Sequence, residues 1–596
     1  MKDLSLDLVS LRAAYDNGLD PHTLIDLVYD RIEAANDPGI FIALRSRADV
    51  HEEIGATRTS GKPLWGVPFA VKDNIDVAGL ATTAACPDFA YMPEADAASV
   101  ARLRAAGAVV IGKTNLDQFA TGLVGLRTPY PAPRNSFDAA IVPGGSSSGS
   151  AVAVARGLVS FALGTDTAGS GRVPAGLNNI VGLKPSVGAV PTRGVVPACR
   201  TLDCVSVFAL TTPDAWEVYA AMAGVDPADA FSRNVPTGAP AQHVKGLRIG
   251  APDIASRKFG GDALAEAAFD AHLESLRALG ATIVDTSFAP FFETARLLYE
   301  GPWIAERHAA LRRFLEQSPD SFLPVTRAIV ESATKFSASD AFDGVYRLAD
   351  HKRIVSTVWN DIDALVVPTF PRPRSVADLQ ADPLGPNAEL GTYTNFVNLL
   401  DLCALAVPGR FRADDFPAGV TFIAPSGEDH VLAGLGAAFH AAARIPLGAT
   451  GAGLPRALFV SPHASDEIEL VVVGAHMSGL PLNRELTELG GRFSRAAETK
   501  PDYRFFALPG GPPFRPGLLR VEAGSGVAIA TEVWTLSPQA FGSFVSRIPS
   551  PLGIGTLSLA DGTAPKGFLV EAEAICGAED ISAYGGWRAF IAAKAA

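Results

Sequence analysis

The chain contains two glycine-flanked serine clusters, Pro143-Gly-Gly-Ser-Ser-Ser-Gly-Ser-Ala151 and Gly164-Thr-Asp-Thr-Ala-Gly-Ser-Gly-Arg-Val-Pro174. Glycine permits positive φ and close backbone approach, and runs of small residues leave N–H groups uncovered. In the second cluster Ser170 directly follows several such N–H groups. Uncovered N–H groups can stabilise a developing oxyanion. The pattern therefore predicts that one turn supplies both a nucleophile and an oxyanion hole.

Other readings of these loops fit less well. A glycine- and serine-rich stretch is most often an ordinary loop. No lysine completes a nucleotide-binding P-loop here, and no G-x-G-x-x-G follows a strand. Residues 145–149 match G-x-S-x-G with Ser147 as the nucleophile, but Pro143 and Gly144 stand where that motif requires a strand. A catalytic turn around Ser170 remains the better interpretation.

Two further stretches accompany the serine clusters, Leu64-Trp-Gly-Val-Pro-Phe-Ala-Val-Lys-Asp-Asn-Ile-Asp76 and Gly112-Lys-Thr-Asn-Leu-Asp-Gln-Phe-Ala120. Together with the clusters they resemble the amidase signature family. The resemblance implies a Ser-Ser-Lys triad, with Ser170 as nucleophile, Ser146 as bridging serine 24 positions earlier, and Lys72 as base. It also implies an oxyanion hole made by the backbone N–H groups of Thr167, Ala168, Gly169 and Ser170.

Such a triad sets a physical requirement on Lys72. A serine hydroxyl is a poor nucleophile until a base takes its proton, so the lysine must be neutral. The ordinary lysine pKa is about 10.4, and a base working near neutrality needs it lowered by roughly three units through burial. The apolar run 64–71 leads directly into Lys72 and predicts that burial. Asp166 and Arg172 flank Ser170 and are expected to pair across the loop.

Tyr299 and Arg307 are candidates for substrate selection. They are eight positions apart, about two helical turns, and share a helix face if Gly301-Pro302 bends the helix without ending it. A guanidinium offers a carboxylate two parallel charge-assisted hydrogen bonds. The pair is therefore a candidate carboxylate site, whereas a solvated helix arginine beside Glu306 is the ordinary alternative.

The resemblance narrows at Leu116-Asp-Gln-Phe-Ala-Thr-Gly-Leu-Val-Gly125, where Gln118 replaces the Glu of many amidases. This segment and the Tyr299/Arg307 pair resemble the allophanate hydrolase branch of the family. In that branch an arginine and a tyrosine hold the terminal carboxylate of urea-1-carboxylate (allophanate). The substrate-binding residues that the resemblance implies are Gly122, Gly125, Tyr299 and Arg307.

Length and pattern predict two domains. The chain has 596 residues, enough for more than one core, and between about 65 and 210 short apolar strands alternate with helices, which indicates an α/β fold. The family implies a mixed sheet wrapped by helices. Residues 446–456, rich in Gly and Pro, are expected to link an amidase domain (1–445) to a C-terminal domain (457–596). The latter resembles the C-terminal domain of allophanate hydrolases, a small α+β domain related to the γ-glutamylcyclotransferase-like barrel.

His476 is the candidate functional residue of this second domain, and two interpretations stay open. In the first, the domain decarboxylates the N-carboxycarbamate that the amidase domain releases, with His476 as acid/base and basic groups such as Arg515 or Lys566 holding carboxylates. In the second, the domain is a binding or oligomerisation module and decarboxylation is spontaneous.

Composition excludes several classes of function. A net charge of −13 argues against nucleic-acid binding, and no apolar run approaches the length of a membrane span. Five scattered cysteines favour a cytoplasmic protein. Because the sequence has no H-E-x-x-H motif and no Cys/His cluster, we expect no metal, and we expect no other cofactor. A homodimer and functional coupling to a biotin-dependent urea carboxylase are also expected on the family resemblance.

The function we expect from the sequence is hydrolysis of allophanate to ammonia and N-carboxycarbamate, in urea degradation. Three alternatives remain: a related amidase acting on malonamide or an aryl amide, a component of an amidotransferase, and a catalytically silent anion-binding scaffold. An intact Lys72, Ser146 and Ser170 argue against the scaffold.

Overall fold

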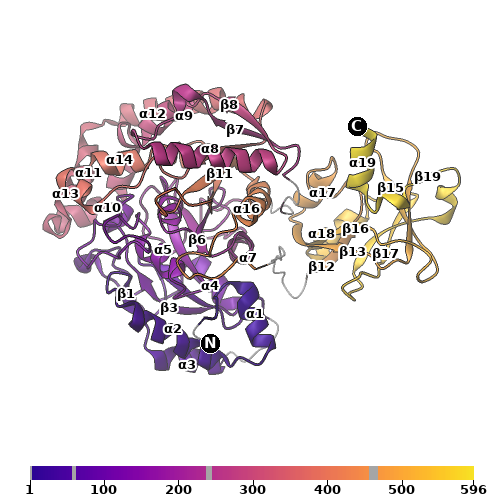
Figure 1. Ribbon diagram of the computed structural model, residues 1–596, viewed down its shortest axis with the longest axis horizontal. Helices are drawn as coiled ribbons and strands as arrows, with labels where there is room; N and C mark the ends of the chain where they lie inside the picture. Colours follow the sequence, from indigo (N-terminus) through magenta and orange to yellow (C-terminus); the bar gives the residue numbers. More distant parts are fainter. Residues whose placement is uncertain (1–2, 57–61, 236–239, 241–243, 456–466, 596) are drawn as a thin grey trace. The chain divides into compact units, whose positions relative to one another are not determined.

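A computed structural model describes residues 3–56, 62–235, 240, 244–455 and 467–595 of the chain (Figure 1). The chain divides into two compact units. The first contains the described residues 3–56, 62–235 and 244–455, and the second contains residue 240 and residues 467–595.

The first unit is built on one eleven-stranded sheet. Its strands, in spatial order, are β1 (Phe41–Leu44), β3 (Val109–Thr114), β2 (Pro68–Lys72), β4 (Phe161–Asp166), β6 (Cys204–Ala209), β5 (Val181–Lys184), β10 (Leu402–Pro408), β11 (Gly419–Pro425), β9 (Ala364–Pro368), β7 (Arg248–Pro252) and β8 (Thr282–Thr286). β2 runs parallel to β3 and β4, whereas β6 is antiparallel to β4 and β5. The sheet is therefore mixed, as predicted.

The central strands are buried on both faces, which explains their continuous apolar sequences. Every residue of β2, β4 and β6 is buried, and Phe69 of β2 stacks on Phe161 of β4 with ring centroids 4.9 Å apart. The pairing of these strands sets the positions of both candidate catalytic segments. Lys72 is the last residue of β2, and the turn that carries Ser170 follows directly after β4.

Sixteen α-helices of the described part of this unit accompany the sheet. They are α1 (Leu8–Asp16), α2 (Pro21–Ala35), α3 (Arg47–Ala56), α4 (Ala98–Ala105), α5 (Ser148–Ala155), α6 (Val173–Leu177), α7 (Thr212–Met222), α8 (Ala263–Ala278), α9 (Ala289–Tyr299), α10 (Trp303–Gln317), α11 (Pro324–Glu331), α12 (Ala338–Ser356), α13 (Val376–Ala381), α14 (Gly385–Leu390), α15 (Phe396–Leu399) and α16 (Asp429–Ala443).

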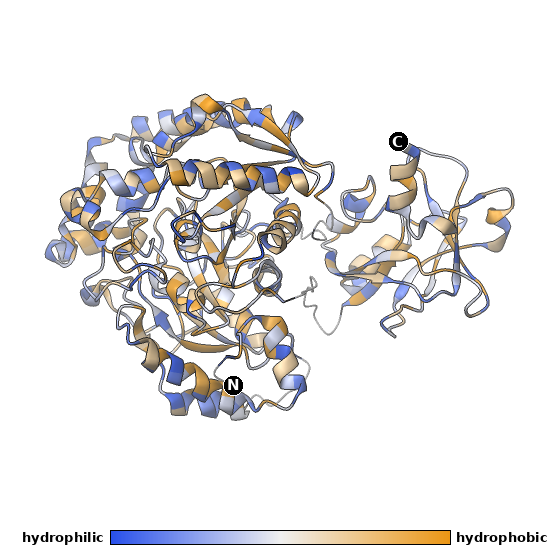
Figure 2. Cartoon of the chain, viewed as in Figure 1, coloured by the Kyte–Doolittle hydropathy of each residue, from blue (hydrophilic) through white to orange (hydrophobic). Residues whose placement is uncertain are grey.

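In two of these helices, α8 and α5, the residue types explain how the helix is buried. α8 is amphipathic, with alternating hydrophobic and hydrophilic residues along it in Figure 2, and its buried side includes Phe269, Leu273 and Leu276. α5 contains only Ser, Gly, Ala and Val, and all eight of its residues are buried. Its Gly149 packs against the backbone of Ile40, so a Cβ there would lie 2.2 Å from the Ile40 carbonyl oxygen. Small residues thus place the first serine cluster in the interior.

The condition under which Tyr299 and Arg307 would share one helix face is not met, because the helix ends between them. α9 ends at Tyr299 and α10 begins at Trp303, with Pro302 as the N-cap of α10. A proline lacks the N–H that would continue the hydrogen-bond ladder of α9. The two residues are instead brought close by the contact between two separate helices.

The stretch expected to be a linker begins as part of the first unit. Leu447 is fully buried, Ala449 N–H donates to the Ala155 carbonyl at 2.7 Å, and Asn179 Nδ2 donates to the carbonyls of Pro446 and Gly448. Small residues in this stretch therefore serve close packing as well as a turn. The rest of the expected linker, from residue 456, lies outside the described residues.

The second unit has its own hydrophobic core, which includes Phe505, Trp534 and Trp587. Its sheets are β13-β16-β12-β18-β17 and β15-β14-β19. Its elements are β12 (Ile468–Val472), α17 (Asn483–Thr487), β13 (Arg492–Glu498), β14 (Tyr503–Ala507), β15 (Pro516–Arg520), β16 (Ala530–Leu536), α18 (Pro538–Val545), β17 (Leu552–Thr556), β18 (Lys566–Val570), β19 (Glu579–Asp580) and α19 (Trp587–Ala595). A smaller C-terminal α+β domain is thus confirmed.

Candidate active site

Lys72 lies in a buried cluster of hydroxyl groups. Its Nζ is 2.7 Å from Ser146 Oγ and 2.8 Å from Thr165 Oγ1. Asn74 Nδ2 also donates to Thr165 Oγ1, at 3.3 Å. Lys72, Ser146 and the β4 strand that carries Thr165 are therefore brought together, as the Ser-Ser-Lys pattern requires for its first two members.

The burial of Lys72 changes its acidity. The side chain has no exposed surface, and this desolvation lowers the pKa of Lys72 to about 7. The carboxylates of Asp117, Asp203 and Asp166 act in the opposite direction, and Arg307 adds to the lowering. A substantial neutral fraction is therefore available near neutral pH, which a general base needs.

The turn after β4 carries Ser170 and four candidate oxyanion-hole residues. Thr167, Ala168 and Ser170 have backbone N–H groups without a hydrogen-bond partner in the described parts of the chain. Gly169 differs, because its N–H donates to Asp166 Oδ1 at 3.0 Å. Its φ of 130° shows that this residue supplies conformation to the turn, so we assign three N–H groups rather than four to the candidate oxyanion hole.

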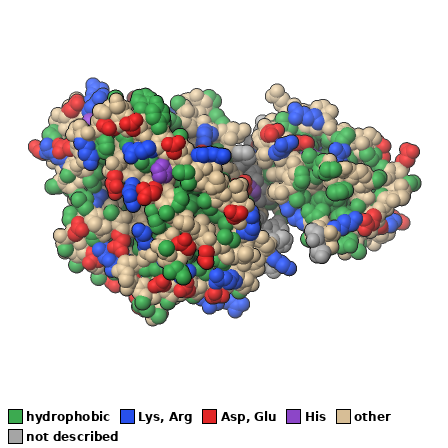
Figure 3. Space-filling view, turned by 90° about the horizontal axis from the view of Figure 1, so that it is seen from above, with side chains coloured by type: hydrophobic (Ala, Val, Ile, Leu, Met, Phe, Trp, Pro, Cys, Tyr) green, Lys and Arg blue, Asp and Glu red, His purple; other side chains and the backbone are tan. Residues whose placement is uncertain are grey.

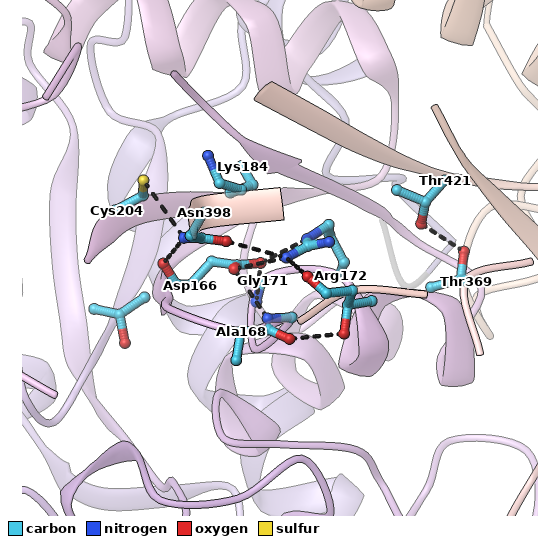
Figure 4. Close-up of polar contacts among 12 residues, drawn as sticks. Asp166, Ala168, Gly171, Arg172, Lys184, Cys204, Thr369, Asn398 and Thr421 are labelled. Carbon is cyan, nitrogen blue, oxygen red and sulfur yellow. Dashed lines mark hydrogen bonds and ion pairs between the residues drawn. The ribbon is translucent and has the colours of Figure 1, made fainter. Parts of the chain in front are cut away.

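A buried ion pair holds this turn from behind (Figure 4). Arg172 Nε and Nη2 contact Asp166 Oδ2 and Oδ1 at 2.9 and 3.0 Å, and neither side chain is exposed. Burial by itself raises the pKa of Asp166, but Arg172 and the Gly171 N–H more than offset it, so the pKa lies below its ordinary value. The predicted pair is confirmed, and it is a core contact rather than a surface one.

Other groups around this pair fix the backbone of the turn. Asn398 Nδ2 donates to the Asp166 carbonyl at 2.8 Å, and Thr394 Oγ1 donates to the Ala168 carbonyl at 2.7 Å (Figure 4). Both residues come from the segment around α15, more than 220 positions along the chain. The orientation of the Ala168 and Ser170 N–H groups therefore depends on contacts that are distant in sequence.

Asp117 organises the predicted glycine loop. Its Oδ2 accepts the N–H of Gly125 at 3.0 Å and its Oδ1 accepts that of Arg127 at 2.8 Å. A Cβ on Gly122 would lie 2.6 Å from Asp117 Oδ2, and one on Gly145 2.1 Å from the same atom. These glycines let the backbone wrap around a buried carboxylate, while backbone contact of Gly122 and Gly125 with a substrate stays a prediction.

Arg307 is buried and only partly satisfied by the protein. Its Nη1 donates to Thr121 Oγ1 at 2.7 Å and to the carbonyls of Phe119 and Ala120 at 3.2 and 3.4 Å. The Cys199 thiol also interacts with the guanidinium, and Nε and Nη2 have no oxygen acceptor among the residues that the structure describes. One edge of the guanidinium is thus anchored, and the other is available to a ligand.

Tyr299 is close enough to Arg307 for the guanidinium charge to act on its hydroxyl. Burial raises the pKa of Tyr299, while the positive charges of Arg307 and Arg127 act against that rise. Within the described ranges its hydroxyl has no hydrogen-bond partner, so it can bind a ligand oxygen. The structure therefore brings the two predicted substrate residues together in one charged environment.

Several residues of this site were not singled out from the sequence. Thr165 contacts Lys72, Asp117 holds the glycine loop, and Arg127 donates to the Thr121 carbonyl at 2.9 Å. Gln118, read as a family marker, ties two loops together: its Nε2 donates to the Ser321 carbonyl and its Oε1 accepts the Leu323 N–H. Asp117 and Arg127 lie within or beside the quoted motif 116–125, and that position was their only signal in the sequence.

His476 lies in the second unit and lines a cavity of about 150 Å³ there. Its Nε2 is 3.1 Å from Glu485 Oε2, and its ring stacks on Phe568 with centroids 5.2 Å apart. Burial lowers the pKa of His476, Glu485 opposes this, and Arg515 adds to the lowering. Burial thus favours the neutral form of His476. The residue does not belong to the Lys72 cluster, which lies in the first unit.

Two arginines line the same cavity, Arg515 and Arg547. Neither side chain has an ion-pair or hydrogen-bond partner in the described ranges, so both are available to an anion. Arg547 was not predicted. Lys566, the other basic residue suggested by the sequence, does not line the cavity, because its Nζ is bonded to Thr556 Oγ1 at 3.0 Å on the exposed surface.

Neither a metal site nor a membrane span is found among the described residues. Within the described residues, no group of three or more His, Cys, Asp or Glu side chains could hold a metal ion, and no helix is long and apolar enough to cross a bilayer. The face drawn in Figure 3 carries acidic and basic side chains interspersed with apolar ones. The chemistry of the described parts therefore concentrates in the Lys72 cluster and the His476 cavity.

Two family models match this chain, one in each of its two units. Residues 23–433 match the Amidase family, and residues 468–592 match the Allophanate hydrolase C-terminal domain. Urea amidolyase of Saccharomyces cerevisiae is 43% identical over 545 residues, which cover 89% of this chain and 30% of that protein. The chain thus spans about a third of the length of the curated urea amidolyases that it matches.

A solved structure is similar over nearly the whole chain, and shorter relatives are similar over about three quarters of it or less. Allophanate hydrolase of Kluyveromyces lactis is 41% identical with a TM-score of 0.76, and 97% of each chain is covered. A glutamyl-tRNA(Gln) amidotransferase component from Deinococcus deserti is 33% identical, covering 73% of this chain and 96% of that protein. The fold and the matches define a hydrolase acting on amides. The chain belongs to the amidase family, and its second unit is an allophanate hydrolase C-terminal domain.

Proposed function

We propose that this protein hydrolyses allophanate, releasing ammonia and N-carboxycarbamate, as a step in urea degradation. The observation that carries the proposal is the half-anchored Arg307, whose Nε and Nη2 have no oxygen acceptor in the described residues, together with Tyr299, which is close enough for the Arg307 charge to act on it. Allophanate is small and carries one carboxylate, which a guanidinium edge binds through two parallel hydrogen bonds. The names of the K. lactis structure and of the urea amidolyases support the same substrate.

In the proposed reaction, Ser170 Oγ attacks the terminal amide carbon of allophanate and forms a tetrahedral oxyanion. The free N–H groups of Thr167, Ala168 and Ser170 stabilise that charge. Neutral Lys72 takes the serine proton through Ser146, and the same relay gives it to the leaving nitrogen, so ammonia departs. Water then cleaves the resulting acyl-enzyme ester to N-carboxycarbamate and restores Ser170.

The second unit is proposed to take over that product. The cavity beside His476 holds two unpaired arginines within the described residues, which suits a small molecule with two carboxylates. Loss of one carboxylate as carbon dioxide leaves a carbamate, which needs a proton on nitrogen, and His476 with Glu485 is placed to move it. The competing interpretation, a binding module with spontaneous decarboxylation, uses the arginines of the cavity but requires no proton transfer by His476.

Alternative functions fit the site less well. A neutral-amide hydrolase would bury Arg307 and Arg127 without a counter-charge on its substrate, which is costly. An amidotransferase component is represented among the relatives, but those matches cover about 73% of this chain. We further propose functional coupling to a biotin-dependent urea carboxylase, which would supply allophanate, and a homodimer, which sedimentation analysis would test.

The test is ammonia release from allophanate by the full chain. Ser170→Ala is expected to abolish it, and Lys72→Ala to lower it at least about a thousandfold. Ser160→Ala is a matched control, because Ser160 is equally buried and its Oγ has no hydrogen-bond partner in the described parts. Turnover of neutral malonamide with allophanate inert would assign another amidase function, and an active Ser170→Ala protein would exclude Ser170 as the nucleophile.

A further inference from the structure

Thr121 is the point at which two buried arginines of the site converge. It follows the short helix η2 (Gln118–Ala120) and is 1% exposed. Its Oγ1 accepts from Arg307 Nη1 at 2.7 Å, and its carbonyl accepts from Arg127 Nη1 at 2.9 Å. Its hydroxyl proton goes to the Phe119 carbonyl at 3.2 Å, so both functions of the hydroxyl are used.

These contacts fix the orientation of Arg307. The bond to Thr121 is the shortest of the three that Nη1 makes, since the carbonyls of Phe119 and Ala120 are 3.2 and 3.4 Å away. A guanidinium is planar and rigid, so anchoring one nitrogen sets the plane of the others. The direction in which Nε and Nη2 meet a carboxylate therefore depends on where Thr121 Oγ1 lies.

Arg127 in turn fixes Thr121. Its Nη2 donates to the Pro383 carbonyl at 2.7 Å while Nη1 holds the Thr121 carbonyl, so it bridges two separate loops. It is 6% exposed and close enough to Arg307 and Tyr299 for their charges to interact. Among the described residues, Asp117 is the aspartate whose charge acts on Arg127. Two buried arginines thus lie close together at this site.

We propose that Thr121 is the positioning residue of the substrate carboxylate site, and that Arg127 is its support and the second source of positive potential for an anionic substrate. This inference rests on the proposed function of Arg307. Neither residue touches the reacting atoms, so both act on substrate binding and selectivity rather than on the chemical step.

Thr121→Val removes the hydroxyl and keeps the shape of the side chain. The shortest Arg307 contact is lost, and the guanidinium is free to turn away from the productive plane. A hydrogen bond to a charged group is worth roughly a tenfold change in affinity. We expect the KM for allophanate to rise about tenfold while kcat stays within about twofold, and Thr121→Ser to restore the KM.

The experiment uses the full chain with three variants and two binding probes. Thr326→Val is the matched control, because Thr326 is fully buried and its Oγ1 has no hydrogen-bond partner among the described residues. Calorimetric binding to Ser170→Ala protein compares malonamate, which carries a carboxylate, with neutral malonamide. Thr121→Val in that background should weaken malonamate about tenfold and leave malonamide unchanged.

Each result has a defined meaning. An unchanged KM in Thr121→Val, or equal weakening of malonamate and malonamide, overturns the inference. If Thr121→Val fails to fold, Arg127→Gln serves in its place, with the same expected loss of malonamate selectivity. Failure of wild-type protein to turn over allophanate would instead refute the proposed function, and the malonamate comparison would still decide whether Thr121 orients an anion-binding Arg307.

Discussion

Lys72 has only hydroxyl groups as direct hydrogen-bond partners among the described residues, Ser146 and Thr165. The nearby carboxylates interact with it through space but make no ion pair with it in the described ranges. A buried ammonium without a paired anion is strongly disfavoured, which is why the neutral amine dominates at a pH where lysine is ordinarily charged. The neighbouring Lys113 differs, since its Nζ pairs with Asp73 at 3.0 Å.

This environment predicts the pH dependence of the first ammonia release. Below a pKa of about 7 the protonated fraction of Lys72 grows, so kcat/KM should fall about tenfold per pH unit. Asp203, whose pKa burial raises to about 6, holds the Thr167 hydroxyl and two backbone N–H groups and adds a second titration. Rate profiles of wild type and Asp203→Asn separate the two. A wild-type profile that is flat down to about pH 5.5 would rule out Lys72 as the base.

At this scale the sequence singled out Lys72, Ser146 and Ser170 but not the residues that contact them, and the role of the three as a triad stays a prediction. Lys72, Ser146 and Ser170 lie in motifs whose spacing is recognisable, whereas Thr165 and Thr121 are ordinary threonines in sequence. Their roles arise only when β2 and β4 pair, or when α10 packs on η2. Gly169 shows the opposite limit. Its backbone N–H was predicted to bind the oxyanion, but in the structure that N–H donates to Asp166, and the residue contributes its positive φ to the turn.

The turn between β4 and α6 is the element on which the proposed catalysis depends. Asp166 at the end of β4 accepts the N–H groups of Gly169 and Gly171, and Arg172 neutralises it. The N–H groups of Thr167, Ala168 and Ser170 are then left without a hydrogen-bond partner among the described residues. Local hydrogen bonds, rather than helix or sheet ladders, thus create the uncovered donors.

Gly169→Ala should disrupt this element. Its φ of 130° is a conformation that L-residues rarely adopt, and an added Cβ would lie 2.4 Å from Thr394 Oγ1. We expect kcat for allophanate to fall at least about a hundredfold, by analogy with loss of an oxyanion donor. Gly261→Ala is the control, because Gly261 also has positive φ but nothing within 4 Å of an added Cβ. Activity of Gly169→Ala equal to that of the control would show that the turn tolerates rearrangement.

Element boundaries were predictable where periodicity alone sets them. β2, β4 and the amphipathic α8 follow from apolar runs and from helical spacing. The break between α9 and α10 was not, because Gly301-Pro302 is compatible with either a bend or an end. Pro302 removes the N–H that would continue α9, and the packing of α9 against α12 and α15, which no local signal reports, accompanies the break.

At the scale of the whole molecule, each unit has its own core and its own candidate chemistry. The first carries the Lys72 cluster, and the second carries the cavity beside His476. A glycine- and proline-rich stretch indicated the division, but residues 446–452 pack on the first unit because Leu447 and Gly448 fit against it. Composition therefore located the boundary only approximately.

Separate cores predict that the two proposed steps respond independently to mutation. In the full chain, His476→Ala should leave the initial rate of ammonia release from allophanate within about twofold, because Lys72, Ser146 and Ser170 belong to the other unit. Carbon dioxide release should then lag behind ammonia, at the rate of uncatalysed decarboxylation. Ser170→Ala should abolish both signals, since the second step has no substrate without the first.

The measurement is simultaneous recording of ammonia and carbon dioxide, with Lys566→Ala as the matched control. Lys566 is a cation of the same unit, but it lies on the exposed surface bonded to Thr556 and does not line the cavity, so no lag is expected. Arg515→Gln should reproduce the lag by removing a cation from the cavity. Identical time courses for His476→Ala and wild type would favour a binding or oligomerisation role for the second unit, with spontaneous decarboxylation.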